Sequence, residues 1–498
     1  MSEERKKEQA SAEEQILEAP SLLDDIVAAT KVKPEDDGYS LTKRGIKEFI
    51  SQIIEPGRKV DRVSNVLIDD MIAEIDNKLS LQLDAILHNS DFQKLESAWK
   101  SLEFLVKHTD FRQNIRFTLL NVSKDELLED FNNELDITKT GLYQKVYSGE
   151  FGQHGGEPFG NMVANYEFTP RAQDMKLLKD VASVAAMAHC PFVASAGPEF
   201  FGIDDFNELP KVKDLESHFE GPDYVKWQSL RDSDDSRNVA LAMPRFLLRL
   251  PYDSKANPVK AFNYNENVSG SHEDYLWGNA AFAFATNLTK SFADFRWCTQ
   301  IIGPQGGGNI RDLPLHQFDS LGGTKTKIPT EVLISDRREY ELSEQGFMGL
   351  TYRKGKDDAC FFSANSIQKP KNFPDTEEGN AAKTTYTLGT QLPYMFVANR
   401  LAHYMKVIQR ENIGTWKSAS ELNTELNKWI SQYVSDQDNP SAETRSRRPL
   451  RKAQIIVEEV AGEPGWYKVS LKVVPHFKYS GAYFTLSLVG KLDKKLSS

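Results

Sequence analysis

The sequence has few cysteines and no apolar run long enough to cross a bilayer. Three scattered cysteines in 498 residues exclude a disulfide framework and a four-thiolate zinc site, and we expect them to be reduced core residues (Cys190, Cys298, Cys360). No stretch approaches the roughly 18 consecutive apolar residues of a membrane-spanning helix. The first residues, MSEERKKEQASAEEQ, are too polar for a secretory signal. These absences predict a cytoplasmic protein without direct membrane insertion.

Basic residues are outnumbered by acidic ones. The chain holds 61 Lys and Arg against 72 Asp and Glu, which gives a formal net charge of -11. Nucleic-acid binding draws on clustered Lys and Arg, so this balance disfavours nucleic acid and favours protein partners. Hydrophobic residues make up 40% and charged residues 27%, as in ordinary globular proteins, and the length allows more than one folded core.

Recognisable catalytic and metal-binding patterns are missing too. The nine histidines include no H-E-x-x-H and no pair three or four residues apart, so the sequence predicts no metal site. A glycine-rich run at 303–308 is followed by Asn309 and Ile310, where a phosphate-binding P-loop needs Lys and then Ser or Thr. We therefore predict no catalytic residues and no cofactor. The alternative left open is a cytoplasmic enzyme that binds a phosphorylated ligand at 303–308.

Residues 1–59 are predicted to form a flexible, largely disordered arm. Residues 1 to about 40 are polar and mostly acidic apart from SLLDDIVAAT at 21–30, where Ser21 can cap a short helix. The apolar residues of this segment fall on one helical face. They are Leu22, Leu23, Ile26 and Val27. A helix of about two turns is too short to persist alone in water, so it either docks into a partner's groove, which we favour, or folds back on its own domain.

Apolar residues at helical spacing predict helices at 41–54 and 60–87, and Pro56 and Gly57 break the pattern between them. Asp91 is expected to cap a third helix, whose apolar residues should turn toward the core. These residues are Phe92, Leu95, Trp99, Leu102 and Val106.

From residue 115 the pattern alternates between short β-rich runs and helical ones. The β-rich runs are IRFTLL, NMVANYEF and PFVASA, and helical patterns cover 124–134 and 171–189. Such alternation predicts a mixed α/β (α+β) domain, which we place at 60–370.

A stretch rich in Pro, Lys and Asn at 365–383 is the best internal boundary, and a second domain is predicted at 371–498. It should contain helices at about 388–411 and 419–434, followed by three β-rich runs. The last run, at 482–490, could pair at home or with the edge of a neighbour's sheet, and its sequence alone favours home pairing. The strand residues singled out are Tyr483, Phe484, Thr485, Leu486, Ser487, Leu488 and Val489.

Two charged segments, at 230–252 and 335–347, are candidate interaction surfaces. Both mix opposite charges, and the first also carries Arg245 and Arg249 in an apolar run. Arginines beside apolar residues lie at interfaces or in half-buried ion pairs, because the guanidinium is weakly hydrated and can bond bidentately. Ion pairing inside the domain is an equally good interpretation. The candidate interface charges are Arg231, Asp235, Arg237, Asp336, Arg337 and Arg338.

Several long strings of residues resemble one family. The first four are ILHNSDFQKLESAWKSLEFLV (86–106), GEFGQHGGEPFGNMVANYEF (149–168), AHCPFVASAGPEFFG (188–202) and KWQSLRDSDDSRNVALAMPRFLLRLPY (226–252). Later strings extend the match at 329–350, 391–414, 426–434 and 466–489. In this order, over most of the chain, they resemble the large sheath subunit of bacterial type VI secretion systems, the TssC or VipB family.

This resemblance implies a multi-domain structural subunit of a contractile sheath rather than an enzyme. It implies pairing with a small sheath subunit of the TssB or VipA type, and polymerisation with other copies of that heterodimer around an inner tube protein of the Hcp type. The sheath would be assembled on a membrane-anchored baseplate and contract to propel the tube. An AAA+ unfoldase of the ClpV type would then recycle it.

The resemblance also implies roles for the two ends of the chain. The L-L-x-x-I-V character of residues 22–27 matches the short N-terminal helix that the unfoldase recognises in family members. The strand at 482–490 resembles the arm by which family members exchange strands between subunits. The resemblance thus turns a predicted home strand into an exchangeable, linking one.

Overall fold

The computed structural model describes most of the chain. The described residues are 36, 38–54, 65–254, 256–268, 272–320, 323–371, 373–415, 417–435, 437, 440–460, 462, 466–476 and 488–489. The predicted docking helix at 21–30 and residues 482–487 and 490 of the predicted terminal strand lie outside this set. The chain divides into two compact units, residues 1–79 and 80–498. Among the described helices, none is long and apolar enough to span a bilayer.

In the unit formed by residues 1–79, the described residues form two helices. These are α3 (Tyr39–Ile54) and most of α4 (Asn65–Leu87), whose last turns belong to the other unit. They confirm the helices predicted from the apolar spacing at 41–54 and 60–87.

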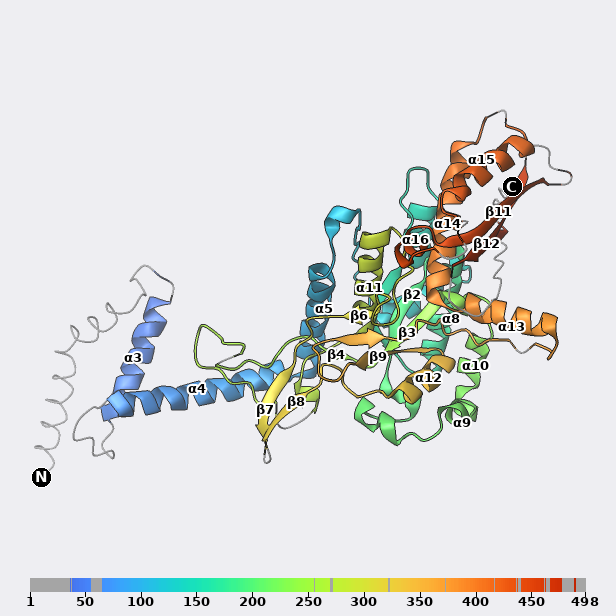
Figure 1. The fold of residues 1–498 in the computed structure, drawn as a ribbon. Helices are drawn as coiled ribbons and strands as arrows, with labels where there is room; N and C mark the ends of the chain where they lie inside the picture. The colour runs from blue at the N-terminus through green and yellow to red at the C-terminus, as the bar shows by residue number, and fades with distance from the viewer. Residues whose placement is uncertain are drawn as a thin grey trace, which may run out of the picture. The chain divides into compact units, whose positions relative to one another are not determined.

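The unit formed by residues 80–498 mixes helices and strands, as predicted (Figure 1). Its helices are α5 (Ser90–Lys107), α6 (Lys124–Asn133), α7 (Gly141–Tyr143), α8 (Ala172–Ala188), α9 (Leu215–Phe219), α10 (Val225–Arg231), α11 (Ala280–Phe295), α12 (Asp336–Glu344), α13 (Glu377–Gly389), α14 (Leu392–Glu411), α15 (Ala419–Ser431) and α16 (Ala442–Arg447). Its strands are β1 (Met162–Phe168), β2 (Phe192–Ala196), β3 (Val239–Met243), β4 (Phe246–Leu247), β5 (Trp277–Gly278), β6 (Asn309–Ile310), β7 (His316–Ser320), β8 (Gly323–Lys327), β9 (Phe347–Tyr352), β10 (Ala359–Phe361), β11 (Leu450–Glu459), β12 (Tyr467–Pro475) and β13 (Leu488–Val489).

A six-stranded sheet forms the centre of this unit. Its strand order is β1-β2-β3-β9-β10-β6. The first four strands are parallel, whereas β10 runs antiparallel to both β9 and β6. Every residue of β2 and β3 is buried, as expected for parallel strands that are covered on both faces.

Helices α8 and α11 cover opposite faces of this sheet. Successive side chains of a strand point to opposite faces, and β2 follows this rule. Phe192 and Ala194 pack in the core that contains α8, while Val193 packs in the core that contains α11. Short apolar residues such as Ala280 and Ala283 let α11 lie close against the strands.

The C-terminal part forms a second, smaller sheet with the order β11-β12-β13. Its strands pair antiparallel, and apolar residues of β11 and β12, such as Ile455 and Leu471, pack against Leu401 of α14 and Ile430 of α15. This arrangement confirms the helices predicted near 388–411 and 419–434 and the first two β-rich runs after them, while only Leu488 and Val489 of the third run are described. Unlike the prediction, α13 already begins inside the 365–383 stretch, where Glu377 and Glu378 occupy a favourable first turn.

Helix α5 corrects two expectations. Its N-cap is Asn89, whose side chain accepts hydrogen bonds from the backbone N–H groups of Asp91 and Phe92, so Asp91 is a first-turn residue instead. The helix also turns a different face inward. Ser101 and Leu105 are buried, whereas four of the five residues expected in the core are exposed and Leu102 is half-buried.

The predicted strand IRFTLL does not form. Residues 111–123 are all described and contain no strand, although half-buried Ile115 and Phe117 alternate with exposed Arg116 and Thr118 as they would in one. Alternation sets which side chains can be buried, but a strand also needs a hydrogen-bonded neighbour. Among the residues that the structure describes, this segment has no such neighbour.

Candidate functional site

Arg231, the first of the candidate interface charges along the chain, lies in the interior. Its side chain is 2% exposed and donates hydrogen bonds to the carbonyl oxygens of Ile367 (2.9 Å) and Glu344 (2.7 Å) and to Gln345 Oε1 (3.0 Å). The guanidinium also lies over the Trp227 ring. Burial lowers the pKa of Arg231 to about 10, so it remains charged at neutral pH. Arg231 thus holds the end of α12 to the body of its own chain.

Asp235 and Arg237 lie nearer the surface. Asp235 is half-buried and accepts a hydrogen bond from the Ser183 hydroxyl (2.9 Å). Arg237 donates to the Asp234 carbonyl oxygen and lies 3.6 Å from the Asp234 carboxylate, which also pairs with Lys371 at 3.3 Å. Exposed pairs of this kind contribute little stability and can be exchanged for others.

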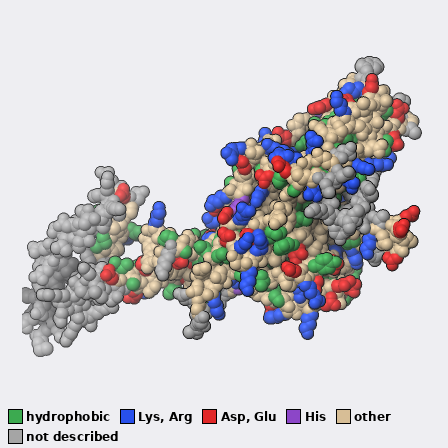
Figure 2. Space-filling view, viewed as in Figure 1, with side chains coloured by type: hydrophobic (Ala, Val, Ile, Leu, Met, Phe, Trp, Pro, Cys, Tyr) green, Lys and Arg blue, Asp and Glu red, His purple; other side chains and the backbone are tan. Residues whose placement is uncertain are grey.

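The candidate charges of α12 likewise include both exposed and largely buried side chains. Asp336 is exposed at the first turn, and the Arg337 side chain is 87% exposed while pairing with Glu341 at 2.8 Å. Arg338 is 15% exposed, pairs with Glu341 at 3.0 Å and donates to the Val212 carbonyl oxygen. Asp336 and Arg337 are therefore available at the surface, while Arg338 fixes α12 in place. Figure 2 shows the wider surface, on which Lys and Arg are interspersed with Asp and Glu.

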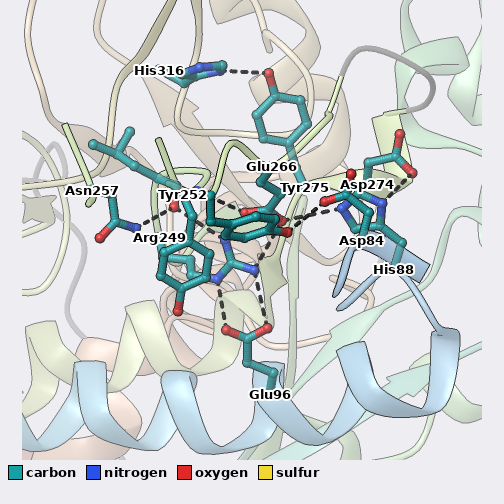
Figure 3. Close-up of polar contacts among 12 residues, drawn as sticks. Asp84, His88, Glu96, Arg249, Tyr252, Asn257, Glu266, Asp274, Tyr275 and His316 are labelled. Atoms are coloured by element: carbon teal, nitrogen blue, oxygen red, sulfur yellow. Dashed lines mark hydrogen bonds and ion pairs between the residues drawn. The ribbon is translucent and has the colours of Figure 1, made fainter. Parts of the chain in front are cut away.

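Arg249 forms a buried ion-pair network behind α5 (Figure 3). Its guanidinium lies between two carboxylates, 2.8 Å from Glu96 Oε1 of α5 and 2.7 Å from Glu266 Oε2. The side chains are 11% exposed for Arg249, 13% for Glu96 and 1% for Glu266. Burial alone would lower the pKa of Arg249, but the hydrogen bonds to Glu266 and Glu96 outweigh it and raise that pKa above its ordinary value. Charge and hydrogen bonding are thus satisfied within the chain.

The same network reaches the end of α4. His88 lies 3.3 Å from Glu266 and 3.7 Å from Asp274, and the Tyr264 hydroxyl donates to Asp84 at 2.6 Å (Figure 3). Residues 80–107 are thereby tied to the loop between β4 and β5. The sequence could suggest half-buried pairing for Arg249, but it could not identify partners 17 and 153 residues away.

A second buried network surrounds Arg245. Its guanidinium pairs with Glu331, whose side chain is fully buried, and with Glu273 at 2.9 Å. Burial would raise the pKa of Glu331, but hydrogen bonds from His272 and Arg245 outweigh it and lower that pKa. Arg245 and Arg249 therefore both form ion pairs inside the domain, which was one of the two interpretations of this charged segment.

Three groups beside Arg245 lie close enough together to be considered as metal ligands. Ligand atoms of Asp205, His272 and Glu331 all lie within 4.8 Å of one another. However, Arg245 already pairs with Glu331, and Lys327 Nζ lies 2.6 Å from His272 Nδ1. Two cationic side chains at these atoms oppose a metal cation, so we interpret the cluster as an ion-pair network.

The glycine-rich loop at 303–308 is packed against its own chain. The Gly303 N–H donates to the Phe361 carbonyl oxygen (2.8 Å), and the Gly306 and Gly308 N–H groups donate to the Gly303 carbonyl oxygen (3.2 and 2.9 Å). A phosphate loop needs such amides to point at the ligand. The adjoining cavity of about 500 Å³ has charges of both signs, including Arg311, Arg353, Asp312 and Asp357. This geometry does not favour the phosphorylated-ligand alternative.

The C-terminal sheet protects one of its edges with a side chain. The Ile455 N–H donates to Asn427 Oδ1 (2.9 Å), and Asn427 Nδ2 donates to the Ile455 carbonyl oxygen (2.8 Å). Asn427 of α15 thus takes the place of a further strand beside β11. On the other side, Leu488 and Val489 pair antiparallel with Leu471 and Ser470 of β12 in the same chain.

Comparison with known proteins decides the family. Residues 69–368 match the model of "EvpB/VC_A0108, tail sheath N-terminal domain", and residues 381–492 match that of "EvpB/VC_A0108, tail sheath gpW/gp25-like domain". The chain is also 38% identical over 485 residues to the type VI secretion system sheath protein TssC1 of Pseudomonas aeruginosa, covering 96% of each chain. The chain belongs to the TssC/VipB family. The resemblance drawn from the sequence strings is confirmed, and the protein is a sheath subunit.

Two solved assemblies of the anti-feeding prophage are similar at a lower level. The contracted helical sheath gives a TM-score of 0.30 at 9% identity, covering 66% of this chain and 67% of that chain. The baseplate gives a TM-score of 0.34 at 11% identity, covering 77% of this chain and 84% of that chain. The family assignment does not depend on these weak likenesses. A structural sheath protein as the relative agrees with the expected non-enzymatic role.

Proposed function

We propose that this chain is the large subunit of a type VI secretion sheath that pairs with a small sheath subunit and polymerises around an inner tube. The observation that supports this proposal most strongly is the 38% identity to a sheath protein, in an alignment that covers 96% of both chains. In this proposal the sheath lies in the cytoplasm, is assembled on a membrane-anchored baseplate, contracts to propel the tube and is then recycled by an AAA+ unfoldase.

The proposed linking element is the terminal strand at 482–490. Its described residues, Leu488 and Val489, pair with Leu471 and Ser470 of β12 at the outer edge of the C-terminal sheet. An outer strand can be replaced by the same strand of a neighbouring copy, because the backbone hydrogen bonds are the same in both arrangements. Strand exchange would keep subunits connected while their bodies rotate.

The contacts proposed to change during contraction are the exposed charges. The candidates are Asp336, which is exposed, and Arg337 and Arg237, whose ion pairs with Glu341 and Asp234 involve solvent-accessible side chains. The buried ion pairs of Arg245 and Arg249 are proposed to stay intact and hold each body rigid. Breaking such a pair would leave a buried charge without its partner, which costs free energy.

Co-expression with the small sheath subunit, followed by electron microscopy, tests the proposal. We expect tubules from the wild-type pair. Deletion of residues 482–498 should abolish them, whereas deletion of 491–498, which removes only the polar tail, should not. Tubules from the longer deletion would contradict strand exchange.

The unfoldase role of the N-terminal arm needs its own test. Replacing Leu22, Leu23, Ile26 and Val27 by Ser should leave tubules intact but prevent their disassembly by the unfoldase. Ile16→Ser with Leu17→Ser is the matched control in the same arm. Disassembly at the wild-type rate by the fourfold variant would exclude the docking helix.

A further inference from the structure

The segment in which α16 leads into β11 concentrates positive charge on an acidic chain. Five of the eleven residues from 442 to 452 are basic, and one, Glu443, is acidic. We call the five basic residues the basic patch: Arg445, Arg447, Arg448, Arg451 and Lys452. Four of them are exposed and Arg445 is half-buried. The net charge of the whole chain is -11, so the patch is opposite in sign to the molecule that carries it.

The charge of the basic patch is largely unpaired, unlike that of the buried arginines described above. In the part of the chain that the structure describes, the one ion pair of the patch joins Arg447 to Glu443 at 3.2 Å. The patch also converges on one place. Burial lowers the pKa of His476, and the charges of Arg445 and Arg451 both add to this effect. A partner with several carboxylates can therefore meet more than one of these cations at once.

The backbone that carries the basic patch is fixed at both ends. The Ser441 side chain caps α16 by accepting a hydrogen bond from the Thr444 N–H (3.2 Å). Leu450 is fully buried, its N–H donates to the Tyr433 carbonyl oxygen (3.2 Å), and its carbonyl oxygen accepts from the Ser435 N–H (2.9 Å). A surface held in this way loses little conformational freedom when a partner binds.

A depression of about 470 Å³ beside α8 carries the opposite charge. Its lining includes the exposed Asp136 and the half-buried Asp235, together with Ala186 and Met187 of α8. Glu134 is exposed next to this lining in the sequence. We call the depression with these three carboxylates the acidic depression.

The acidic depression has the chemistry of a socket for arginine. Carboxylates bond a guanidinium group bidentately, and the apolar side chains of α8 suit its weakly hydrated face. Hydrogen bonds from Thr138 lower the pKa of Asp136, so this carboxylate is ionised at neutral pH. Lys139 acts on Asp136 from the same turn, but within the described structure neither Asp136 nor Asp235 forms an ion pair.

We propose that the basic patch of one copy of this chain binds the acidic depression of another copy in the sheath. This inference rests on the proposed function, which supplies the neighbouring copies. The two surfaces are complementary in charge, and each is largely without counter-charge in the described part of its own chain. A contact between two different surfaces of one chain is head-to-tail, and such contacts build an open helix when the rotation does not close.

Other occupants fit the basic patch less well. The net charge of -11 repels nucleic acid, which is a polyanion. Residues 8–25 of this chain hold six acidic residues and no basic one, so they are the competing occupant. They would leave the acidic depression without a partner, whereas a contact between copies satisfies both surfaces.

Charge reversal with rescue tests the pairing in tubules of the co-expressed complex. Arg448→Glu with Arg451→Glu reverses the basic patch, and Glu134→Arg with Asp136→Arg reverses the acidic depression. Each double variant should reduce sedimentable tubules about tenfold or more, because like charges then face each other. The fourfold variant should restore them, because opposite charges meet again.

The rescue distinguishes a lost contact from a folding defect, since a misfolded surface is not repaired by substitutions on the other one. Lys226→Glu with Lys290→Glu is the control, because both lysines are exposed and lie outside the two surfaces. Wild-type tubule yield from either double variant, a fourfold variant that assembles no better than the doubles, or an equal loss in the lysine control would overturn the proposal.

Carbodiimide crosslinking identifies the occupant directly, because it joins the Lys452 amine to a carboxylate in contact with it. In tubules that mix unlabelled and ¹⁵N-labelled copies, we expect crosslinks from Lys452 to Glu134 or Asp136 that combine one light and one heavy peptide. Crosslinks from Lys452 only to residues 8–25 or to the small subunit, or none, contradict the proposal. If wild-type tubules form in these cases, the proposed function still stands. If the wild-type pair forms no tubules, the proposed function fails and the contact between copies fails with it.

Discussion

Removing the Arg249 guanidinium should reveal how strongly the buried network holds α5. Arg249→Met keeps most of the side-chain volume but leaves Glu266, which is 1% exposed, without its cation. Glu96 also loses its partner, although it retains more contact with solvent. Breaking one partner out of a buried pair costs about 3–5 kcal/mol because it leaves an uncompensated charge. We expect the free energy of unfolding to fall by about that amount.

Urea unfolding followed by tryptophan fluorescence measures this change. The decisive comparison is Arg249→Met with and without Glu266→Gln. Neutralising residue 266 removes the stranded charge, so the double variant should recover about 2 kcal/mol relative to the single one, within the range of coupling energies between contacting residues. A single variant that loses less than about 1 kcal/mol, or a double variant whose losses simply add, would refute the argument.

Three further predictions concern other parts of the fold. Burial lowers the pKa of His403 from 6.5 to about 4, so the unfolded state binds the proton at a higher pH than the folded state does. The free energy of unfolding should therefore fall by about 3 kcal/mol as the pH drops from 6.5 to 4, and His403→Gln should remove that loss in thermal unfolding. Asn427→Ala should destabilise the chain by about 1–3 kcal/mol, seen as faster hydrogen exchange at Ile455, because both backbone groups lose their partner. Gly307→Ala should lower the melting temperature, because φ is +86° and a Cβ would meet the Gln300 carbonyl oxygen; an unchanged melting temperature would contradict tight packing of this loop.

Periodicity predicted the layers of the fold well, because burial imposes it directly on the residues. The buried run PFVASA became β2, and the pattern at 171–189 became α8, which covers one face of that strand. These elements are surrounded by their own chain, so the rule that apolar residues turn inward applies without change.

The same rule gave the wrong face for α5, and the reason is physical. The helix has apolar residues on two sides, and the pattern alone does not say which side meets its own chain. The larger set, including Leu95 and Trp99, looked like the core face, but Ser97, Ser101 and Leu105 occupy it because α11 and β5 pack closely there. A helix with more apolar residues than its own domain can bury is a sequence signal of an interface.

The candidate charges could be found from the sequence, but their roles could not. Arg231 and Arg337 stand in similar mixed-charge contexts, yet one is 2% exposed and the other has an 87% exposed side chain. The difference comes from the carbonyl oxygens of Glu344 and Ile367, which lie more than 110 residues away along the chain and are brought to Arg231 only by folding.

The buried ion pairs indicate why this body retains charges where apolar residues would serve stability equally well. A buried pair adds little net stability over a well-packed apolar substitute, but it accepts only one geometry. Arg249 satisfies both Glu96 and Glu266 only when α5 and the loop before β5 are in a single register. That register also sets the direction in which Leu95 and Trp99 face. On this argument the network specifies the orientation of α5, so weakening it should loosen that orientation even where the apolar contacts of Leu105 with α11 are unchanged.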